Sequence, residues 1–373
     1  MGMWPRKDEP LARLFSLGCV LATLSATGCR AGCGGGSEAK GERPALLRRV
    51  GGPPEATPIA VDIDDERNVF LVAGMRGPIQ VWSETDTGTA SVASVPVAGA
   101  LLTARFARGG VLFAQEQGAT ALWSWVENRA LFTHDFGARA RRAAISPDRH
   151  YVAFGGSVVE VASNHDVGDP KPVASQSALA FSADSSRVVS AGFQEPWIAV
   201  RDLPGGATRE WLAPGKVSHA ALSSTGDLVT ASMNDGSVHT WRQPSGEALG
   251  VWQGAKEIRG LCFASTGSMV VVADPQGLSV VDATSGQRAW RTDVEGTLWT
   301  FACDGGLAAA GTTDGDLWLW ELSSHALVAR ARLSAAPIVA LDISAVRHRL
   351  AAADEKGEAA IWGWRSPADT SPK

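Results

Sequence analysis

Histidine, acidic and cysteine side chains are the groups from which this chain would have to build a metal or catalytic site. Its seven histidines are dispersed singly, at positions 134, 150, 165, 219, 239, 325 and 348. A catalytic zinc requires three nitrogen, oxygen or sulfur ligands that converge, and this spacing supplies no such set. No nucleophile elbow, Walker loop or dinucleotide-binding glycine pattern occurs in a matching context. We therefore expect no enzyme activity, no metal site and no cofactor.

Four acidic residues in five positions are the other candidate ligand set: Asp62, Asp64, Asp65 and Glu66. An EF-hand calcium loop needs a longer spacing of its ligands and a glycine at its sharp turn, and both are missing here. We interpret these residues as a solvated hairpin between the first two strands of the first repeat.

The whole chain is organised by a repeat of about 40 residues, seen most clearly at Thr313–Glu321. An Asp-Gly turn there precedes a strand of alternating residues that reaches Trp320, as a tight hairpin requires. Alignment on that position gives steps of 41, 38, 40, 40, 40, 39 and 42 residues between Trp82, Trp123, Val161, Arg201, Trp241, Val281, Trp320 and Trp362. We assign the five tryptophans of this series, Trp82, Trp123, Trp241, Trp320 and Trp362, to packing between repeats. A period this regular, built from short strands, predicts a propeller or a linear array.

Four apolar runs per repeat predict four strands, so the fold class is all-β and the architecture an eight-bladed β-propeller. The last repeat ends at its third strand, which would leave a blade open at its edge. We predict that residues 45–50 supply the missing fourth strand and close the ring. The alternative is seven blades, with the weak third repeat, Arg142 to Ser175, merged or distorted.

These runs resemble the WD40-repeat family over Ala45 to Trp364. The resemblance rests on apolar-x-Phe-Ser-x-Asp runs such as Leu179–Asp184 and on Asp-Gly-led third strands that end in Trp. No Gly-His pair precedes a repeat and no Trp is followed by Asp, so the buried Asp-His network of the family is not implied. One repeat, Val281–Trp290, looks instead like a quinoprotein-type propeller repeat.

The resemblance also implies a binding face. In WD-repeat propellers, one face is formed by the turns between second and third strands and by the connections between blades, and it commonly binds partner proteins. Trp and Arg dominate the hot spots of interfaces. We therefore expect the following residues to share a partner-binding face: Arg76, Arg139, Arg141, Arg142, Trp197, Asn234, Lys256 and Arg259.

The first 44 residues are expected to lie outside the fold. A basic start precedes Leu14–Leu24, an apolar run too short to cross a membrane, which predicts a secretory signal peptide over residues 1–28. Ser25–Cys29 resembles a bacterial lipobox, which implies lipidation of Cys29. Arg30 follows this cysteine in place of Asp, which implies transfer to the outer membrane. Residues 29–44 are then a Gly-rich tether, 45–365 the propeller and 366–373 a disordered tail.

Composition excludes some partners and leaves the state of two cysteines open. A net charge of −5 and a pI near 5.8 give no polycation for nucleic acid. Cys262 and Cys303 fall in the first strands of repeats six and seven, and an oxidising compartment would allow them to pair. We expect buried free thiols in preference, because neighbouring inner strands usually lie too far apart for a disulfide.

Three functions fit the sequence. The first is a non-catalytic, lipid-anchored, monomeric scaffold that binds proteins in the cell envelope, exported to the outer membrane and facing the periplasm or the cell surface. The second is a component of an outer-membrane protein assembly machine, whose propeller lipoprotein this chain resembles in architecture. The third is a quinoprotein-like dehydrogenase or a binder of a ligand in the central channel, for which we find no candidate residues.

Overall fold

The computed structural model describes residues 45–51, 56–84, 89–107, 109–137, 142–154, 157–167, 176–192, 196–264 and 267–364. The predicted signal peptide, tether and tail, together with Arg139 and Arg141, lie outside the described residues. The described part contains strands and no helix, and therefore no helix long and apolar enough to cross a membrane. Its strands belong to one unit of the chain, Lys40–Lys373.

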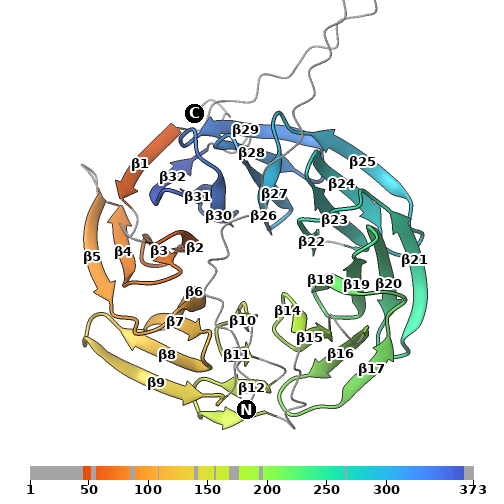
Figure 1. Cartoon of the computed structure of the whole chain (residues 1–373), viewed down its shortest axis with the longest axis horizontal. Coiled ribbons are helices and arrows are strands. Elements are labelled where there is room, and N and C mark those ends of the chain that lie inside the picture. Colours follow the sequence, from red (N-terminus) through yellow and green to blue (C-terminus); the bar gives the residue numbers. More distant parts are fainter. Residues whose placement is uncertain are drawn as a thin grey trace, which may run out of the picture. The chain divides into compact units, whose positions relative to one another are not determined.

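Eight antiparallel sheets of four strands follow one another around a ring (Figure 1). Blade 1 consists of β2 (Pro58–Asp64), β3 (Val69–Gly74), β4 (Ile79–Glu84) and β5 (Thr89–Val95). Blade 2 consists of β6 (Leu101–Ala107), β7 (Gly110–Gln115), β8 (Ala119–Ser124) and β9 (Arg129–Asp135). Blade 3 consists of β10 (Ala143–Ile145), β11 (Tyr151–Phe154), β12 (Ser157–Glu160) and β13 (His165–Asp166). Blade 4 consists of β14 (Gln176–Phe181), β15 (Arg187–Gly192), β16 (Trp197–Asp202) and β17 (Thr208–Leu212).

The second half of the ring repeats this order. Blade 5 consists of β18 (Val217–Leu222), β19 (Leu228–Met233), β20 (Ser237–Arg242) and β21 (Glu247–Gln253). Blade 6 consists of β22 (Gly260–Phe263), β23 (Met269–Asp274), β24 (Gly277–Asp282) and β25 (Arg288–Asp293). Blade 7 consists of β26 (Leu298–Asp304), β27 (Leu307–Thr312), β28 (Asp316–Glu321) and β29 (Ala326–Arg332). Blade 8 consists of β30 (Ile338–Ser344), β31 (Arg349–Asp354), β32 (Glu358–Gly363) and β1 (Ala45–Gly51).

The ring closes through β1, as the unfinished last repeat predicts. β1 pairs antiparallel with β32, from Ala45 opposite Gly363 to Gly51 opposite Glu358. The predicted all-β fold with eight blades and an N-terminal closing strand is therefore confirmed, and the seven-blade alternative is wrong. The third repeat is a complete but short blade: β10 has three residues and β13 has two, and Val161 follows β12 instead of lying within it.

Turn chemistry fixes where the strands of each blade reverse. In the turns between second and third strands, Gly236 and Gly315 adopt φ values of +85° and +83°, which L side chains rarely reach. A Cβ atom at Gly236 would also collide with the carbonyl oxygen of Ala255. In the turns between first and second strands, the Ser182 hydroxyl donates to Asp184 at 2.6 Å, and this carboxylate accepts the Ser186 N–H.

The blades are held together by apolar layers between neighbouring sheets. Trp241, Trp320 and Trp362 are 5%, 2% and 2% exposed, while Trp82 and Trp123 are half-buried, and each packs in or against an apolar cluster. These five tryptophans therefore contribute to the apolar layers of the ring. Each first strand also contacts the first strands of the two flanking blades, so β2, β6, β10, β14, β18, β22, β26 and β30 form a continuous inner ring.

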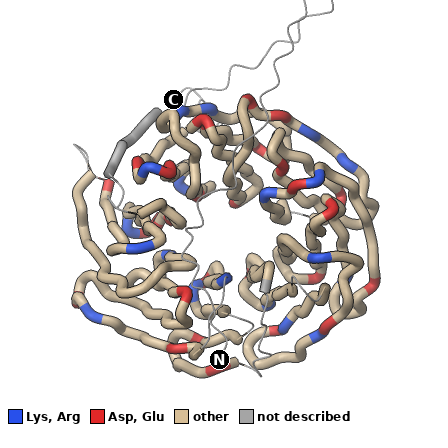
Figure 2. The backbone as a smooth tube through the Cα atoms, viewed as in Figure 1, with Lys and Arg blue, Asp and Glu red and all other residues tan. Residues whose placement is uncertain are grey.

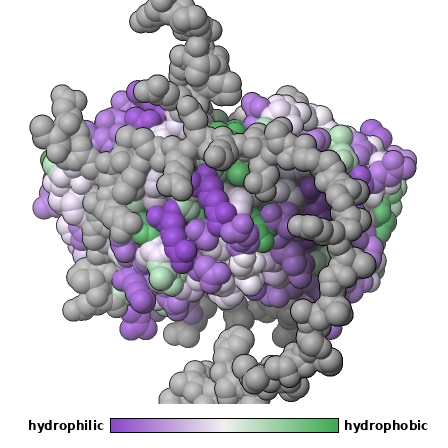
Figure 3. Space-filling model, turned by 90° about the horizontal axis from the view of Figure 1, so that it is seen from above, coloured by the Kyte–Doolittle hydropathy of each residue, from purple (hydrophilic) through white to green (hydrophobic). Residues whose placement is uncertain are grey.

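The surface carries charges of both signs. Lys and Arg are interspersed with Asp and Glu around the ring (Figure 2). On the side wall in Figure 3, hydrophobic residues form small areas separated by hydrophilic ones.

Candidate functional site

One end of the ring gathers the turns and connections in which the sequence places a binding face. Because the four strands of each blade alternate in direction, the 2–3 turns and the 4–1 connections lie at the same end, which we call the mouth face. Backbone hydrogen bonds join the two kinds of segment there. The Asn234 N–H donates to the Lys216 carbonyl at 3.0 Å, and the Leu101 N–H donates to the Met75 carbonyl at 2.9 Å.

The described residues predicted for partner binding all lie at this end of their blades. Arg76 and Asn234 are exposed in 2–3 turns, and Trp197 is the half-buried first residue of β16. Arg142 and Lys256 are exposed, and Arg259 is half-buried, in segments that enter blades 3 and 6.

Only some of these residues interact with the groups around the mouth. Asn234 accepts a hydrogen bond from the Ser218 hydroxyl at 2.5 Å. Burial, together with the charge of Arg142 two blades away, lowers the pKa of His219 to about 4, so this imidazole is neutral at pH 7. Among the described residues, no hydrogen bond or ion pair joins Arg76 or Trp197 to another member of the predicted set.

In six of the eight blades, a β-bulge recurs where the first strand enters the blade at the mouth face. On β26, Leu298 pairs with Thr312 and Thr300 pairs with Gly311, so Trp299 is one residue extra in its ladder. The same shift in five other blades makes six bulge residues: Ile59, Leu102, Ser177, Ser218, Trp299 and Val339. In the five bulges for which the burial of the preceding residue is described, that residue is buried, whereas all six bulge residues are half-buried or exposed: Leu298 is 0% exposed and Trp299 is 44% exposed.

Trp299 is the residue of the mouth face that the sequence interpretation missed. Its indole lies under the Arg259 guanidinium, 4.5 Å from the ring centroid, across the boundary between blades 7 and 6. Arg259 also pairs with Glu257 at 3.1 Å, and its buried Nε has no hydrogen-bond partner. Trp299 follows Arg259 by 40 residues, one repeat, so aligning the strand entries would have placed the two at equivalent positions.

A second recurring position lies three residues after each bulge residue, and we call it the seam position, because in several blades it reaches the next blade. Ala144 and Cys262 are the corresponding residues of blades 3 and 6, in which the described strand pairs have no such shift. Asp62 occupies it in blade 1 and accepts the Phe106 N–H of blade 2 at 2.7 Å. Asp342 occupies it in blade 8 and accepts the Ile63 N–H of blade 1 at 3.1 Å. Asp62 is 3% exposed inside β2, so its assignment to a solvated acidic turn was wrong; the turn itself is residues 65–68.

The two seam carboxylates influence each other. Burial, followed by the neighbouring Asp62 carboxylate, raises the pKa of Asp342 to about 7, and burial also raises the pKa of Asp62. Arg105, at the seam position of blade 2, opposes both shifts.

Cys262, at the seam position of blade 6, forms a disulfide with Cys303 on β26 of blade 7. The expectation of buried free thiols was therefore wrong on both counts, since both residues are half-buried and paired. The reason is geometric: the seam position points at the adjacent inner strand, where the Cα atoms are 6.8 Å apart, within the span that a disulfide can bridge.

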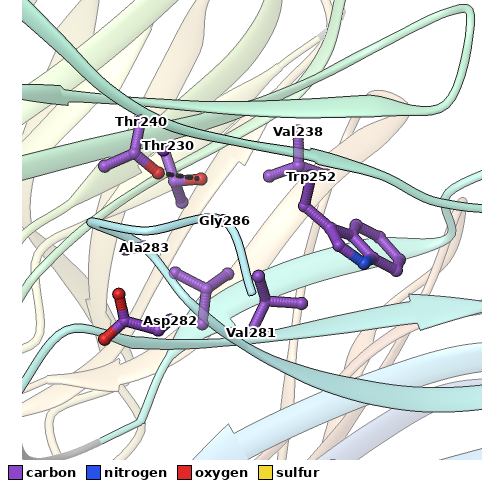
Figure 4. Close-up of a pocket in the computed structure, with 10 residues that line it drawn as sticks. Thr230, Val238, Thr240, Trp252, Val281, Asp282, Ala283 and Gly286 are labelled. Atoms are coloured by element: carbon purple, nitrogen blue, oxygen red, sulfur yellow. Dashed lines mark hydrogen bonds between the residues drawn. The ribbon is translucent and has the colours of Figure 1, made fainter. Parts of the chain in front are cut away.

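A small pocket lies between blades 5 and 6 (Figure 4). The Thr230 and Thr240 hydroxyls lie 3.5 Å apart on one side of it, and Trp252, Val281 and Gly286 complete the wall. Its open space of about 10 Å³ is about enough for one water molecule. This pocket is therefore a packing gap and not a ligand site. In the described part of the chain, no group of three or more His, Cys, Asp or Glu residues is placed to hold a metal.

Comparison with known proteins shows the fold alone. No protein-family model matches the chain, and no curated protein matches it. The computationally designed Ika8 protein is similar in structure, with a TM-score of 0.72 and 17% identity over 85% of this chain and 99% of that one. Saccharomyces cerevisiae Sqt1 gives 0.70 and 9% over 87% and 100%, and the C-terminal WD40 domain of Sif2 gives 0.71 and 12% over 87% and 99%. The chain thus has a WD40-like β-propeller fold.

Proposed function

We propose that this chain is a non-catalytic, lipid-anchored interaction scaffold of the cell envelope that binds a partner protein through the mouth face. The observation that carries the proposal is the exposed Trp299 stacked with Arg259 at that face, because Trp and Arg dominate the hot spots of interfaces. A closed ring presents this surface preformed, so binding orders few additional groups.

The course of β1 supports an anchor at the other end of the ring. Ala45 pairs with Gly363, the last residue of β32, so the chain enters the ring at the face opposite the mouth. Fifteen residues separate Cys29 from Ala45, a reach of at most about 58 Å when fully extended. An acyl chain on Cys29 would hold the ring near a membrane, raise its effective concentration toward partners there, and leave the mouth face unobstructed.

The Cys262–Cys303 disulfide supports export. Disulfides persist in oxidising compartments such as the bacterial periplasm or the cell surface and are rare in the cytosol. This bond and the predicted signal peptide are independent features that indicate the same compartment.

A role in an outer-membrane protein assembly machine is the second candidate. The eight blades favour this role, because the propeller lipoprotein of that machine, which the chain resembles in architecture, also has eight. A quinoprotein-like dehydrogenase has no comparable support, because the described residues contain no metal-ligand group to accompany such a cofactor.

The test is in-cell crosslinking of the tagged chain with mass spectrometry, beside membrane fractionation of wild type and Cys29→Ala. We expect membrane recovery that is lost in Cys29→Ala and one stoichiometric protein partner, identified as a barrel-assembly component if the second candidate holds. Charge reversal at Arg139 and Arg141, and Trp197→Ala, test the remaining predicted residues. A Cys29→Ala protein that stays in the membrane fraction would contradict the anchor, and a wild type that crosslinks to nothing would contradict the scaffold.

A further inference from the structure

The bulge residues divide the entrance of the ring into two unlike halves. Around the inner ring, blades 7, 8, 1 and 2 follow one another, and β26, β30, β2 and β6 lie side by side in that order (Figure 1). Their bulge residues are all apolar and together form what we call the apolar arc: Trp299, Val339, Ile59 and Leu102. Met75, which is 49% exposed, extends the apolar arc, because its carbonyl accepts a hydrogen bond from the N–H of Leu101 at the start of β6.

The other half of the entrance is polar and carries positive charge. Blades 4 and 5 have serine at the bulge, Ser177 and Ser218. Arg142 enters blade 3, and Lys256 and Arg259 enter blade 6; we call these three residues the cationic arc. Arg142 is exposed immediately before β10, the inner strand of blade 3, and its charge contributes to the lowered pKa of His219 in blade 5.

Arg259 joins the two arcs and is poised to bind an anion. Stacking on Trp299 fixes its guanidinium plane at the boundary between blades 6 and 7. Its present ion partner, Glu257, has a side chain that is 60% exposed, and exposed ion pairs contribute little free energy. A carboxylate from a partner can replace Glu257, form a second hydrogen bond to the fork-shaped guanidinium, and remain beside the apolar arc.

We propose that the mouth face binds a segment of a partner protein that presents a large apolar side chain next to carboxylates. This proposal rests on the proposed scaffold function and names the partner chemistry. The apolar side chain packs on Trp299 and its neighbours in the apolar arc, and the carboxylates pair with Arg259 and Arg142. Charge complementarity selects this occupant: the chain has a net charge of −5, yet the arc that borders the apolar half of the entrance is cationic.

The test uses synthetic 12-residue peptides and the full mature chain in detergent. One peptide pool places Trp or Leu between Glu residues, a second replaces the Glu by Lys, and a third replaces the Trp or Leu by Ser. Fluorescence anisotropy gives the dissociation constant of each pool at low and at physiological salt. The variants are Trp299→Ala and Arg259→Gln. The matched control is Arg129→Gln at the opposite face, where Arg129 pairs with Glu127, also two residues away, at 2.5 Å.

We expect the Glu pool to bind, to weaken as salt is added, and to lose about 10-fold or more in affinity in both mouth variants but not in Arg129→Gln. Equal binding of the Lys pool, retention of binding in Trp299→Ala and Arg259→Gln, or binding of no pool would overturn the inference. The scaffold function fails separately, because its readouts are the crosslinked partner and the Cys29-dependent membrane fraction. A partner crosslinked outside the mouth face would refute this inference and the choice of face in the proposed function, and would leave the lipid-anchored scaffold role itself intact.

Discussion

Removing the disulfide between blades 6 and 7 should destabilise the ring by an amount that the fold itself sets. Cys262 and Cys303 are 41 residues apart in sequence, so their bond closes one repeat of the unfolded chain. In the chain-entropy model, a loop of this length corresponds to ~4 kcal/mol of unfolding free energy at 25 °C. Both side chains are half-buried, so we expect replacing the sulfur atoms by alanine to add little through lost packing.

The assay is equilibrium unfolding in urea, followed by the fluorescence of the 14 tryptophans, for wild type and the Cys262→Ala/Cys303→Ala variant. The variant should be less stable than the oxidised wild type by ~4 kcal/mol at most, which corresponds to a fall in midpoint temperature of roughly 6 °C for a ring of this size. Wild type unfolded in the presence of reductant is the control, because it should match the variant. The slope of the urea transition should rise in both, since an unlinked unfolded chain exposes more surface.

Two results would refute the reasoning. One is a double variant whose stability equals that of the oxidised wild type within ~0.5 kcal/mol, the usual scatter of a neutral substitution. The other is direct: if the unfolded, non-reduced chain titrates with two reactive thiols at positions 262 and 303, the bond is absent in the protein.

Three further predictions test the seam, the turns and the anchors. Because the pKa of Asp342 is raised from 3.8 to about 7, the folded chain binds this proton more tightly than the unfolded chain, and stability should fall as the pH rises from about 4 to about 7. Asp342→Asn should flatten that part of the curve in urea titrations, and an unchanged slope would contradict the shift. Gly77→Ala should lower the free energy of unfolding by the ~1 to 2 kcal/mol of left-handed backbone strain, because no atom lies within 4 Å of the new Cβ. Gly236→Ala should lower it by more, because its Cβ also collides with Ala255. Equal falls in the urea midpoint for the two variants would contradict this collision. Trp320→Ala should cost ~3 to 5 kcal/mol in urea unfolding, and a loss as small as that of the exposed Trp299→Ala would contradict its role as an anchor.

The features that the sequence predicts correctly are those set by local chemistry. Asp-Gly turns such as Asp235-Gly236 and Asp314-Gly315 require a left-handed glycine, and alternation up to an anchor such as Trp320 fixes the third strand. Repeated every 40 residues or so, these signals determine the blade count. The closing strand then follows from a simple deficit, because the last blade has three strands at the C-terminus and the segment at residues 45–50 belongs to no other repeat.

The errors come from distances between blades, which no local pattern encodes. Asp62 has three acidic residues within four positions of it, and this composition suggested a solvated turn; its burial depends on the β6 backbone of the next blade. In the sequence, Trp299 is indistinguishable from an ordinary residue of an alternating strand. Its exposure depends on the β-bulge, a one-residue shift in the pairing of β26 with β27. The disulfide required the separation of two neighbouring inner strands, which the general expectation for such strands overestimated here.

The seam position shows how the ring uses one geometric opportunity in unlike ways. In a repeat architecture, stability is close to a sum over neighbouring units and their interfaces, so each seam can be strengthened independently. Ala144, Ala180, Ala221 and Ala302 add no polar link at this position. Cys262 adds a covalent bond between blades 6 and 7. Asp342 accepts a backbone hydrogen bond across the seam between blades 8 and 1, and Asp62 accepts one across the seam between blades 1 and 2. Those two seams lie on either side of blade 1, which is next to blade 8. Blade 8 is the blade that β1 completes from the other end of the chain. Extra links there oppose separation where the ring depends on one noncovalently paired strand. Because burial raises the pKa of Asp342, this seam is most stable in mildly acidic conditions, where the buried carboxyl is protonated.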